Sequence, residues 1–238
     1  MVDLLIPEIR SVVTVGDGRG FAVQTGQDRL VVTAAHCLPD VPLCATFSHP
    51  TERIYQAVLG PLRDERTVWA ECLFADPIGD IAVLGPPNNN EFPREAEAYD
   101  ALVDSVTPST ISDPLRAMSP PLSVHGIERD PVFLPHTTGA WLLSLAGEPF
   151  RCRVTHNPGS LWVSETVQDI RPGMSGSPII ADDGSAIGVF CTSSGVPGEK
   201  SNREHGPNPG LADHLPGWLL REIGLSFSAP LLVAPPTN

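Results

Sequence analysis

The sequence predicts an all-β protein made of two antiparallel six-stranded β-barrels and a short C-terminal helix. Two observations lead to this fold class. The 238 residues include 26 prolines and 21 glycines but only 6% aromatics, which favours many turns and short strands over long helices. Short runs rich in β-branched residues alternate with these turns, and they fall into two sets. With 41% hydrophobic residues, the chain can bury a substantial core.

The first set of runs fills the N-terminal third of the chain. Each run is bounded by Gly, Pro or Asp, which end strands and form turns. Strands at this spacing favour one closed antiparallel barrel. We expect these strands at Ile9–Val15, Gly20–Thr25, Arg29–Thr33, Leu43–Phe47, Arg53–Leu59, Val68–Phe74 and Asp80–Leu84.

A connector separates the two sets. The segment Gly85–Asn90 cannot continue a strand, because its prolines lack ladder donors and its asparagines favour turns. Apolar residues near helical spacing predict a short helix over Arg94–Asp104. Four prolines in Val106–Pro121 then indicate an irregular link between the halves.

The second set predicts a barrel of similar size. After it, Ser194–Pro209 is polar and glycine-rich and is typical of a loop, Leu215–Ile223 predicts a closing helix, and Ser226–Asn238 is a proline-containing tail. We therefore expect a single domain over 1–238, with sub-barrels at about 10–105 and 120–214, a helix at 215–223 and a tail at 226–238. The expected strands of the second set are Leu122–Gly126, Ala140–Leu145, Phe150–His156, Ser160–Thr166, Ser177–Ala181 and Ala186–Thr192.

Charge and cysteine content limit the classes of partner and compartment. A net charge of −13 and a pI near 4.8 disfavour nucleic acid as a partner. The acidic charge favours basic peptides as binding partners, or it simply keeps the protein soluble. Five cysteines without close-spaced pairs argue against a complete disulfide framework, and none has zinc-ligand spacing. Met1–Arg10 lacks signal-peptide character, and no segment is long enough to span a bilayer. The sequence thus predicts a reduced, cytoplasmic protein without membrane contact.

Three short strings supply the groups of one reaction centre. They are Thr-Ala-Ala-His-Cys, Asp-Ile-Ala-Val-Leu and Gly-Met-Ser-Gly-Ser-Pro, and they contribute His36, Asp80 and Ser175 in that order. A serine hydroxyl attacks a carbonyl only when an imidazole removes its proton, and a carboxylate must orient that imidazole. Taken singly, His36 fits a structural histidine, Asp80 a turn residue and Ser175 a loop serine. Together and in order, they favour a catalytic triad.

The strings resemble those of trypsin-like (chymotrypsin-fold) serine peptidases over roughly residues 10–225. The separations of 44 and 95 residues lie close to the roughly 45 and 93 of the chymotrypsin-type template. The resemblance implies Ser175 as nucleophile, His36 as base and Asp80 as its orienting carboxylate, in the cleft between the barrels. It also implies an oxyanion hole made by the amides of Gly173 and Ser175, a peptide or protein substrate, and no cofactor.

Two departures from the family pattern concern activation and disulfides. Met174 stands where secreted members have an aspartate that pairs with a new N-terminus, and no Ile-Val-Gly-Gly-like start is visible. The oxyanion hole must then be held by packing, or be ordered by substrate or by an activating partner that the sequence does not identify. Cys37 lacks its usual partner, because Gly20–Val32 holds no cysteine. The first departure, and the approach Ile170–Gly173, resemble the bacterial heat-shock branch of the family, and the second favours a reduced compartment.

The substrate pocket is less well defined. Asp169 lies six residues before Ser175, where trypsin has the aspartate that selects Arg or Lys, but Asp169 also fits a turn residue or a partner of Arg171. The run Gly16–Phe21 lacks the Lys-Ser/Thr of a phosphate loop and predicts a hairpin turn. By analogy with the family, the remaining residues expected to bind substrate are Phe190, Cys191, Thr192 and Ser193.

These features predict a serine endopeptidase that acts through an acyl-enzyme intermediate. The alternative is a catalytically latent or inactive trypsin-like module that binds peptides or serves as an interaction scaffold. The intact set of His36, Asp80 and Ser175 favours the enzyme.

Overall fold

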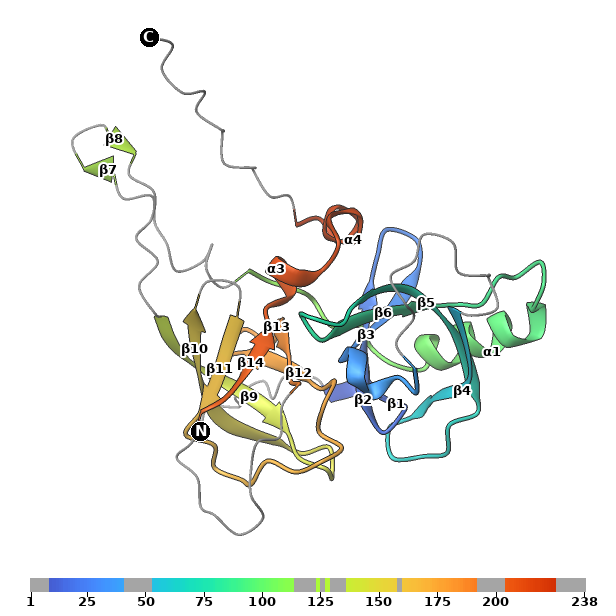
Figure 1. Cartoon of the computed structure of the whole chain (residues 1–238), viewed down its shortest axis with the longest axis horizontal. Coiled ribbons are helices and arrows are strands. Elements are labelled where there is room, and N and C mark those ends of the chain that lie inside the picture. Colours follow the sequence, from blue (N-terminus) through green and yellow to red (C-terminus); the bar gives the residue numbers. More distant parts are fainter. Residues whose placement is uncertain are drawn as a thin grey trace.

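A computed structural model describes residues 9–40, 53–113, 123–124, 127–128, 136–157, 160–191 and 204–225. Within these ranges, two main β-sheets lie side by side and short helices flank them (Figure 1). None of the helices in the described ranges is long and apolar enough to cross a membrane.

The first sheet is a closed six-stranded barrel with the strand order β1-β2-β3-β6-β5-β4. It closes where β1 pairs with β4. Its interior is filled by β-branched and other apolar side chains, as the alternating sequence pattern requires. The strands are β1 (Val12–Val15), β2 (Gly18–Gln24), β3 (Arg29–Thr33), β4 (Ile54–Pro61), β5 (Val68–Asp76) and β6 (Ile81–Gly85).

The second sheet has six strands in the order β13-β12-β9-β10-β11-β14. A single antiparallel bridge between Gly188 and Gly210 brings its two ends together, so the sheet curls into a nearly closed barrel. A separate small hairpin pairs β7 (Ser123–Val124) with β8 (Ile127–Glu128). The strands of the large sheet are β9 (His136–Leu143), β10 (Pro149–Asn157), β11 (Ser160–Ser164), β12 (Pro178–Ala181), β13 (Ala186–Val189) and β14 (His205–Pro209).

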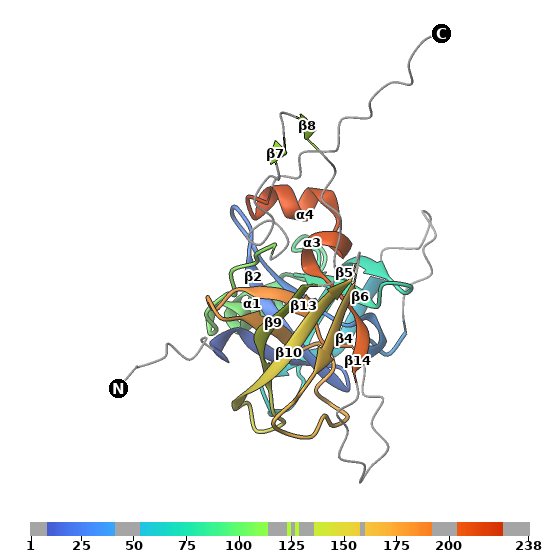
Figure 2. The same cartoon turned by 90° about the vertical axis from the view of Figure 1, so that its left-hand side faces the viewer.

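The helices are short and cover the sides of the sheets. The helix α1 (Pro93–Asp104) packs on β5 and β3, and its fully buried Tyr99 donates a hydrogen bond to a barrel carbonyl (Figure 1). In both views, α3 (Leu211–His214) and α4 (Gly217–Glu222) lie together above the two sheets, and apolar residues of both helices pack in the core between the sheets (Figures 1 and 2). Among the described residues, 3₁₀ turns include η1 (Ile9–Ser11) and η2 (Ala35–Cys37).

An apolar core joins the two sheets to each other. It combines barrel residues such as Phe21 and Ile81 with Leu143 and Val189 of the second sheet. The connector reinforces this junction, because the Ser109 N–H donates to the Ala22 carbonyl and the Ala186 N–H donates to the Thr110 carbonyl, both at 2.8 Å. Burial of this kind is the main force that holds the sheets together.

The predicted fold class is confirmed, and most expected strands coincide with observed ones. The loop prediction for Ser194–Pro209 is wrong at its end, where β14 forms. Its prolines are tolerated because β14 is the last strand of its sheet and pairs only with β11. The closing helix begins after Pro216, at Gly217, and Ile9–Val15 starts as a 3₁₀ turn. Leu43–Phe47 and Ser226–Asn238 lie outside the described residues.

Candidate active site

His36 and Asp80 come together because their strands are neighbours. His36 lies in η2, directly after β3, and Asp80 ends the turn before β6, and β3 pairs with β6. The His36 Nδ1 lies 2.7 Å from the Asp80 Oδ2, and the His36 backbone N–H donates to the Oδ1 at 2.9 Å. Since an ionised carboxylate only accepts, Nδ1 is the donor in this pair. The ring orientation and tautomer of His36 are therefore both fixed by Asp80.

This pairing changes the acidity of the imidazole. The hydrogen bond with Asp80, and after it the Cys37 thiol, raise the pKa of His36 to about 10 from an ordinary value of 6.5. About half of the His36 side-chain surface remains exposed (48%), so the ring can still meet a ligand from solvent. The contact with Asp80 therefore favours the protonated form of the ring.

Asp80 is also held from the second sheet. Its backbone has a φ of +54°, in the left-handed region that few non-glycine residues adopt. The Cys191 thiol lies 3.2 Å from the Asp80 carbonyl oxygen and donates to it. The Cys191 backbone N–H in turn donates to the Asn208 Oδ1 at 2.9 Å. Burial, and after it the charge of Asp80, raises the pKa of the Cys191 thiol, which keeps the donor protonated.

Ser175 lies in a tight turn just before β12. In this turn, some backbone N–H groups donate to the protein itself and others do not. The N–H groups of Met174, Gly176 and Ser177 each donate to a backbone carbonyl. Those of Gly173 and Ser175 donate to no acceptor in the part of the chain that the structure describes. These two free N–H groups can therefore donate to a ligand.

The Ser175 turn packs against the barrel close to His36. The Arg19 N–H donates to the Ser175 carbonyl at 2.8 Å. Gly18 separates that carbonyl from Cys37: a Cβ atom at Gly18 would lie 2.6 Å from the Ser175 oxygen and would overlap the Cys37 sulfur. Among the described residues, the Ser175 Oγ has no hydrogen bond, including none to His36. The structure thus brings the three predicted residues to the junction of the sheets without a Ser175–His36 bond.

Comparison with known proteins gives the family. A model of the trypsin-like peptidase domain matches residues 18–189, which include His36, Asp80 and Ser175.

The chain belongs to the trypsin-like peptidase family.

Solved structures of low sequence identity are also similar to this trypsin-like peptidase chain. The Rv3671c protease of M. tuberculosis, in an inactive form, has 15% identity and a TM-score of 0.49, and 93% of each chain is covered. The apo protease domain of MamO from Magnetospirillum magneticum has 13% identity and a TM-score of 0.45, with 87% of this chain and 95% of that one covered. A search of curated proteins gave no match.

In this trypsin-like peptidase, the residue before Ser175 is an apolar anchor. Met174 is 1% exposed and packs in the core of the second sheet. Its sulfur accepts a hydrogen bond from the Arg171 N–H at 3.2 Å, and its own N–H donates to the Arg171 carbonyl. Packing of Met174 therefore holds the turn, at the position where the pattern of secreted family members has an aspartate for an ion pair.

The residues predicted to bind substrate have varied positions. Asp169 is exposed and forms no hydrogen bond or ion pair within the described ranges, so nothing in the structure connects it with a pocket floor. Phe190 is buried, with its ring centroid 6.5 Å from that of His205. Cys191 is buried beneath Asp80. Thr192 and Ser193 lie outside the described residues.

The four described cysteines are free thiols, and all four are buried. Cys37 packs in the core between the sheets, as a small apolar side chain does. Cys44 lies outside the described residues. No group of three or more His, Cys, Asp or Glu within the described ranges could hold a metal ion.

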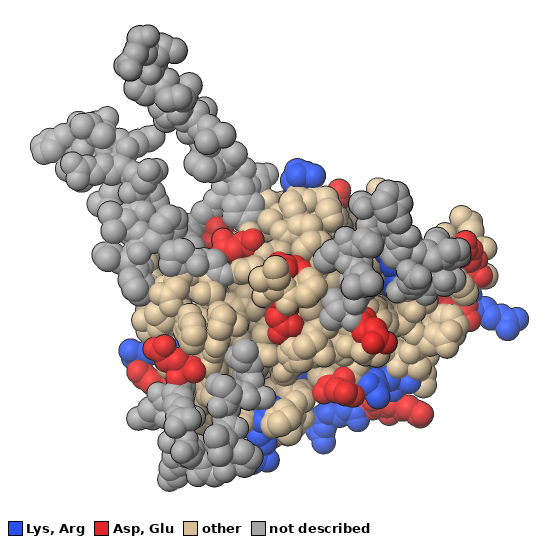
Figure 3. Space-filling model, in the orientation of Figure 1, with Lys and Arg blue, Asp and Glu red and all other residues tan. Residues whose placement is uncertain are grey.

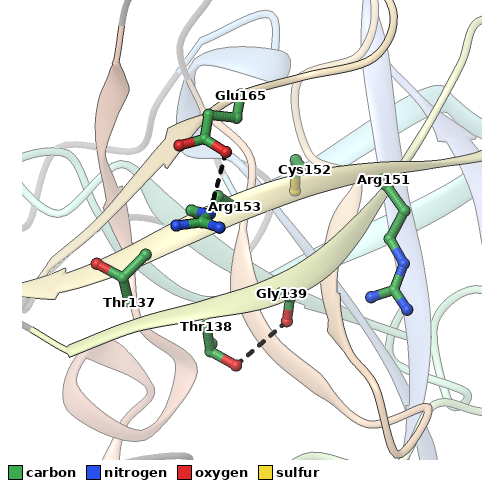
Figure 4. Close-up of a pocket in the computed structure, with 7 residues that line it drawn as sticks. All are labelled: Thr137, Thr138, Gly139, Arg151, Cys152, Arg153 and Glu165. Atoms are coloured by element: carbon green, nitrogen blue, oxygen red, sulfur yellow. Dashed lines mark hydrogen bonds and ion pairs between the residues drawn. The ribbon is translucent and has the colours of Figure 1, made fainter.

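A separate hollow lies on β9 and β10 of the second sheet (Figure 4). In it, the Arg153 guanidinium pairs with Glu165 at 3.1 Å. The hollow contains none of the predicted site residues; it is lined by Thr137, Thr138, Gly139, Arg151, Cys152, Arg153 and Glu165.

On the face shown in Figure 3, acidic side chains occur across the surface and the basic ones lie mainly near its margins.

Proposed function

We propose that this trypsin-like peptidase is a serine endopeptidase with His36, Asp80 and Ser175 as its catalytic residues. The observation that carries the proposal is the two-point contact of Asp80 with His36, through the ring Nδ1 and the backbone N–H. That contact leaves the Nε2 face of the ring free to take a proton. It is the arrangement that a serine nucleophile requires of its base.

The proposed reaction proceeds in two halves. The Ser175 Oγ attacks the peptide carbonyl carbon while the neutral His36 Nε2 takes the hydroxyl proton, and a tetrahedral oxyanion forms. The C–N bond then breaks, and His36 gives the proton to the leaving amine, which leaves an acyl-enzyme. Water, deprotonated by His36, attacks the ester in the same way and releases the acid and Ser175. Asp80 stabilises the imidazolium in both halves and keeps its own charge.

Negative charge develops on the carbonyl oxygen and must be met by donors. The unused N–H groups of Gly173 and Ser175 are the proposed oxyanion hole. The backbone N–H groups of Met174, Gly176 and Ser177 all donate to backbone carbonyls. These bonds hold the turn while the two oxyanion donors stay free. Loss of one such donor typically costs about 100- to 1000-fold in turnover.

A latent state of the same module is the second candidate, and two observations favour it. The Ser175 Oγ has no hydrogen bond to His36 among the described residues, and a His36 pKa of about 10 keeps the ring protonated at neutral pH. A protonated imidazole cannot accept the serine proton. In such a state the chain would bind peptides without cleaving them until a ligand or partner changes the site.

The two candidates differ in their reaction with a fluorophosphonate probe, which labels only a serine activated by its base. We expect the wild-type chain to be labelled, faster at pH 9 than at pH 7, and Ser175→Ala and His36→Ala to be unlabelled. Ser164→Ala, at the end of β11 and outside this turn, is the control and should keep most labelling.

The outcomes separate the proposals. Labelling that persists in Ser175→Ala would show a different nucleophile and overturn the assignment. Absence of labelling at every pH from 6 to 10, in a folded chain that still binds a peptide from a random library, would establish the latent module instead.

A further inference from the structure

Arg19 is a buried cation in an apolar row. Along β2, the residues Arg19, Phe21 and Val23 alternate on the face that meets the second sheet, and the latter two belong to the core between the sheets. Arg19 is only 4% exposed. No carboxylate of the described ranges lies within ion-pair distance of it. A charge is costly to bury without a partner, so a position of this kind calls for a role other than packing.

The backbone N–H and the guanidinium of Arg19 contact the turn that carries Ser175 and the strand β9. Its N–H donates to the Ser175 carbonyl at 2.8 Å, and its guanidinium Nη1 reaches the Ser177 Oγ at 3.5 Å. The same Nη1 donates to the carbonyl of Leu143, the last residue of β9, at 3.3 Å. Arg19 thus contacts the turn on both sides of Gly176 and ties it to β9.

The turn fits closely over the Arg19 backbone. Gly176 has a φ of +82°, and a Cβ atom there would overlap the Arg19 carbonyl oxygen. That same oxygen accepts a hydrogen bond from the Thr33 hydroxyl at 2.6 Å, so β3 fixes Arg19 in turn. On its other side, the turn is bonded to Phe190 of the second sheet through the Gly176 N–H. The segment Arg171–Ser177 has no acidic residue that could anchor it by charge.

We infer that Arg19 is a positioning residue that clamps the Ser175 turn onto the first barrel and so holds the Gly173 and Ser175 N–H groups in place. The inference rests on the proposed function. A displacement of about 1 Å in a catalytic group can cost about 100-fold in rate. Since the guanidinium reaches one sheet from the other, any motion of the sheets relative to each other would loosen the turn and its oxyanion donors together.

The test compares Arg19→Met and Arg19→Lys with Arg29→Met. Arg29 is a matched control, because its guanidinium also donates to backbone carbonyls, those of Val103 and Val106, but it does not touch the turn. Two measurements are made on each full-length variant. One is the deuterium exchange of the amides in 171–178, and the other separates the maximal rate of fluorophosphonate labelling from the apparent affinity for the probe.

In Arg19→Met, we expect the amides of the turn to exchange about 10-fold faster, with the barrel strands unchanged. The maximal labelling rate should fall about 100-fold at unchanged probe affinity. Arg19→Lys should recover part of both, and Arg29→Met should leave both at the wild-type level. If Arg19→Met does not fold, Arg19→Lys alone must show the faster exchange in the turn together with the slower labelling.

Two results would overturn the inference: wild-type exchange in the turn of the Arg19 variants, or a loosened turn that still labels at the wild-type rate. Failure of the proposed function looks different. In that case the wild-type chain is not labelled at all, whereas the exchange measurement still reports whether Arg19 holds the turn.

Discussion

Asp80 accepts from three donors, two on His36 and one on Cys191. Its carboxylate accepts the backbone N–H and the ring of His36, and its carbonyl accepts from the Cys191 thiol. A non-glycine residue in the left-handed region typically costs about 1–3 kcal/mol, which these contacts offset. Since one contact comes from the second sheet, the geometry of the His36–Asp80 pair depends on how the two sheets are joined.

The raised pKa of His36 leads to a prediction about pH. Only the neutral ring can act as a base, so labelling of Ser175 should accelerate as the pH rises from 7 towards 10. In Asp80→Asn the main cause of the shift is gone, and the His36 pKa should fall towards 6.5. Labelling should then level off near neutral pH at a rate about 10⁴-fold lower, because the tautomer is no longer held.

Proton NMR of the His36 ring, followed with pH in both chains, measures the two pKa values directly. A wild-type ring that titrates near 6.5, or an Asp80→Asn profile with an unchanged alkaline midpoint, would contradict this account of Asp80.

Gly18 gives a second prediction at a single residue. In Gly18→Ala, the new methyl group comes too close to both the Cys37 thiol and the Ser175 carbonyl, so the surrounding structure must shift. Overpacking of this kind typically costs about 1–3 kcal/mol in the free energy of unfolding. We expect that loss in urea denaturation, together with slower labelling. The control is Gly217→Ala, at the start of α4, where the nearest described atom lies at an ordinary contact distance. Equal stability of the two variants would show that Gly18 is not confined.

At the scale of the elements, local pattern determines what a sequence can predict. The barrel strands were predictable because apolar residues recur between turn residues, and β3 has the predicted limits, Arg29–Thr33. The strand β14 was not, because a run that contains Pro207 and Pro209 has the composition of a loop, and only its place at the end of a sheet permits pairing. An edge position is a property of the assembled sheet.

The residues of the candidate site likewise differ in whether the sequence could predict them. His36, Asp80 and Ser175 could be predicted because each lies in a distinctive string. Arg19 could not, because the glycine-rich run around it predicts a hairpin turn, and the turn does form at Gly16 and Asp17. The contacts of the Arg19 guanidinium come from residues more than a hundred positions away, which no local pattern encodes.

Asn208 allows a prediction about β14. Its side chain is fully buried, accepts from the Cys191 N–H, and donates to the carbonyls of Leu161 and His205. In Asn208→Ala three backbone groups lose their partner, and each buried group left unsatisfied costs about 1–3 kcal/mol. We expect a large loss in the free energy of unfolding, measured by urea denaturation. Asn89→Ala, in an exposed turn, should stay within about 0.5 kcal/mol of wild type. Similar losses in the two variants would refute the role given to this amide.

At the scale of the whole molecule, three histidines give opposite pH dependences of stability. His156 on β10 and His205 on β14 are buried, and each has one ring nitrogen without a hydrogen bond. Burial lowers the pKa of both; for His156, Asp113 opposes the shift and His136 adds to it. Below about pH 6.5, these two histidines therefore bind protons more readily in the unfolded chain than in the folded chain. Their contribution to stability is complete above pH 6.5 and is lost as the pH falls further.

His36 acts in the opposite direction, since its pKa in the folded chain is raised to about 10. Its contribution is complete below pH 6.5 and is lost as the pH rises towards 10. Thermal unfolding should therefore show Tm increasing from pH 5 to pH 6.5 and decreasing at alkaline pH. His156→Leu and His205→Phe should each flatten the acid limb, whatever their effect on Tm at neutral pH, because a side chain that cannot be protonated removes the linkage. His36→Gln should flatten only the alkaline limb. An acid limb that keeps its slope in both of the buried-histidine variants would place the acid sensitivity in the carboxylates instead.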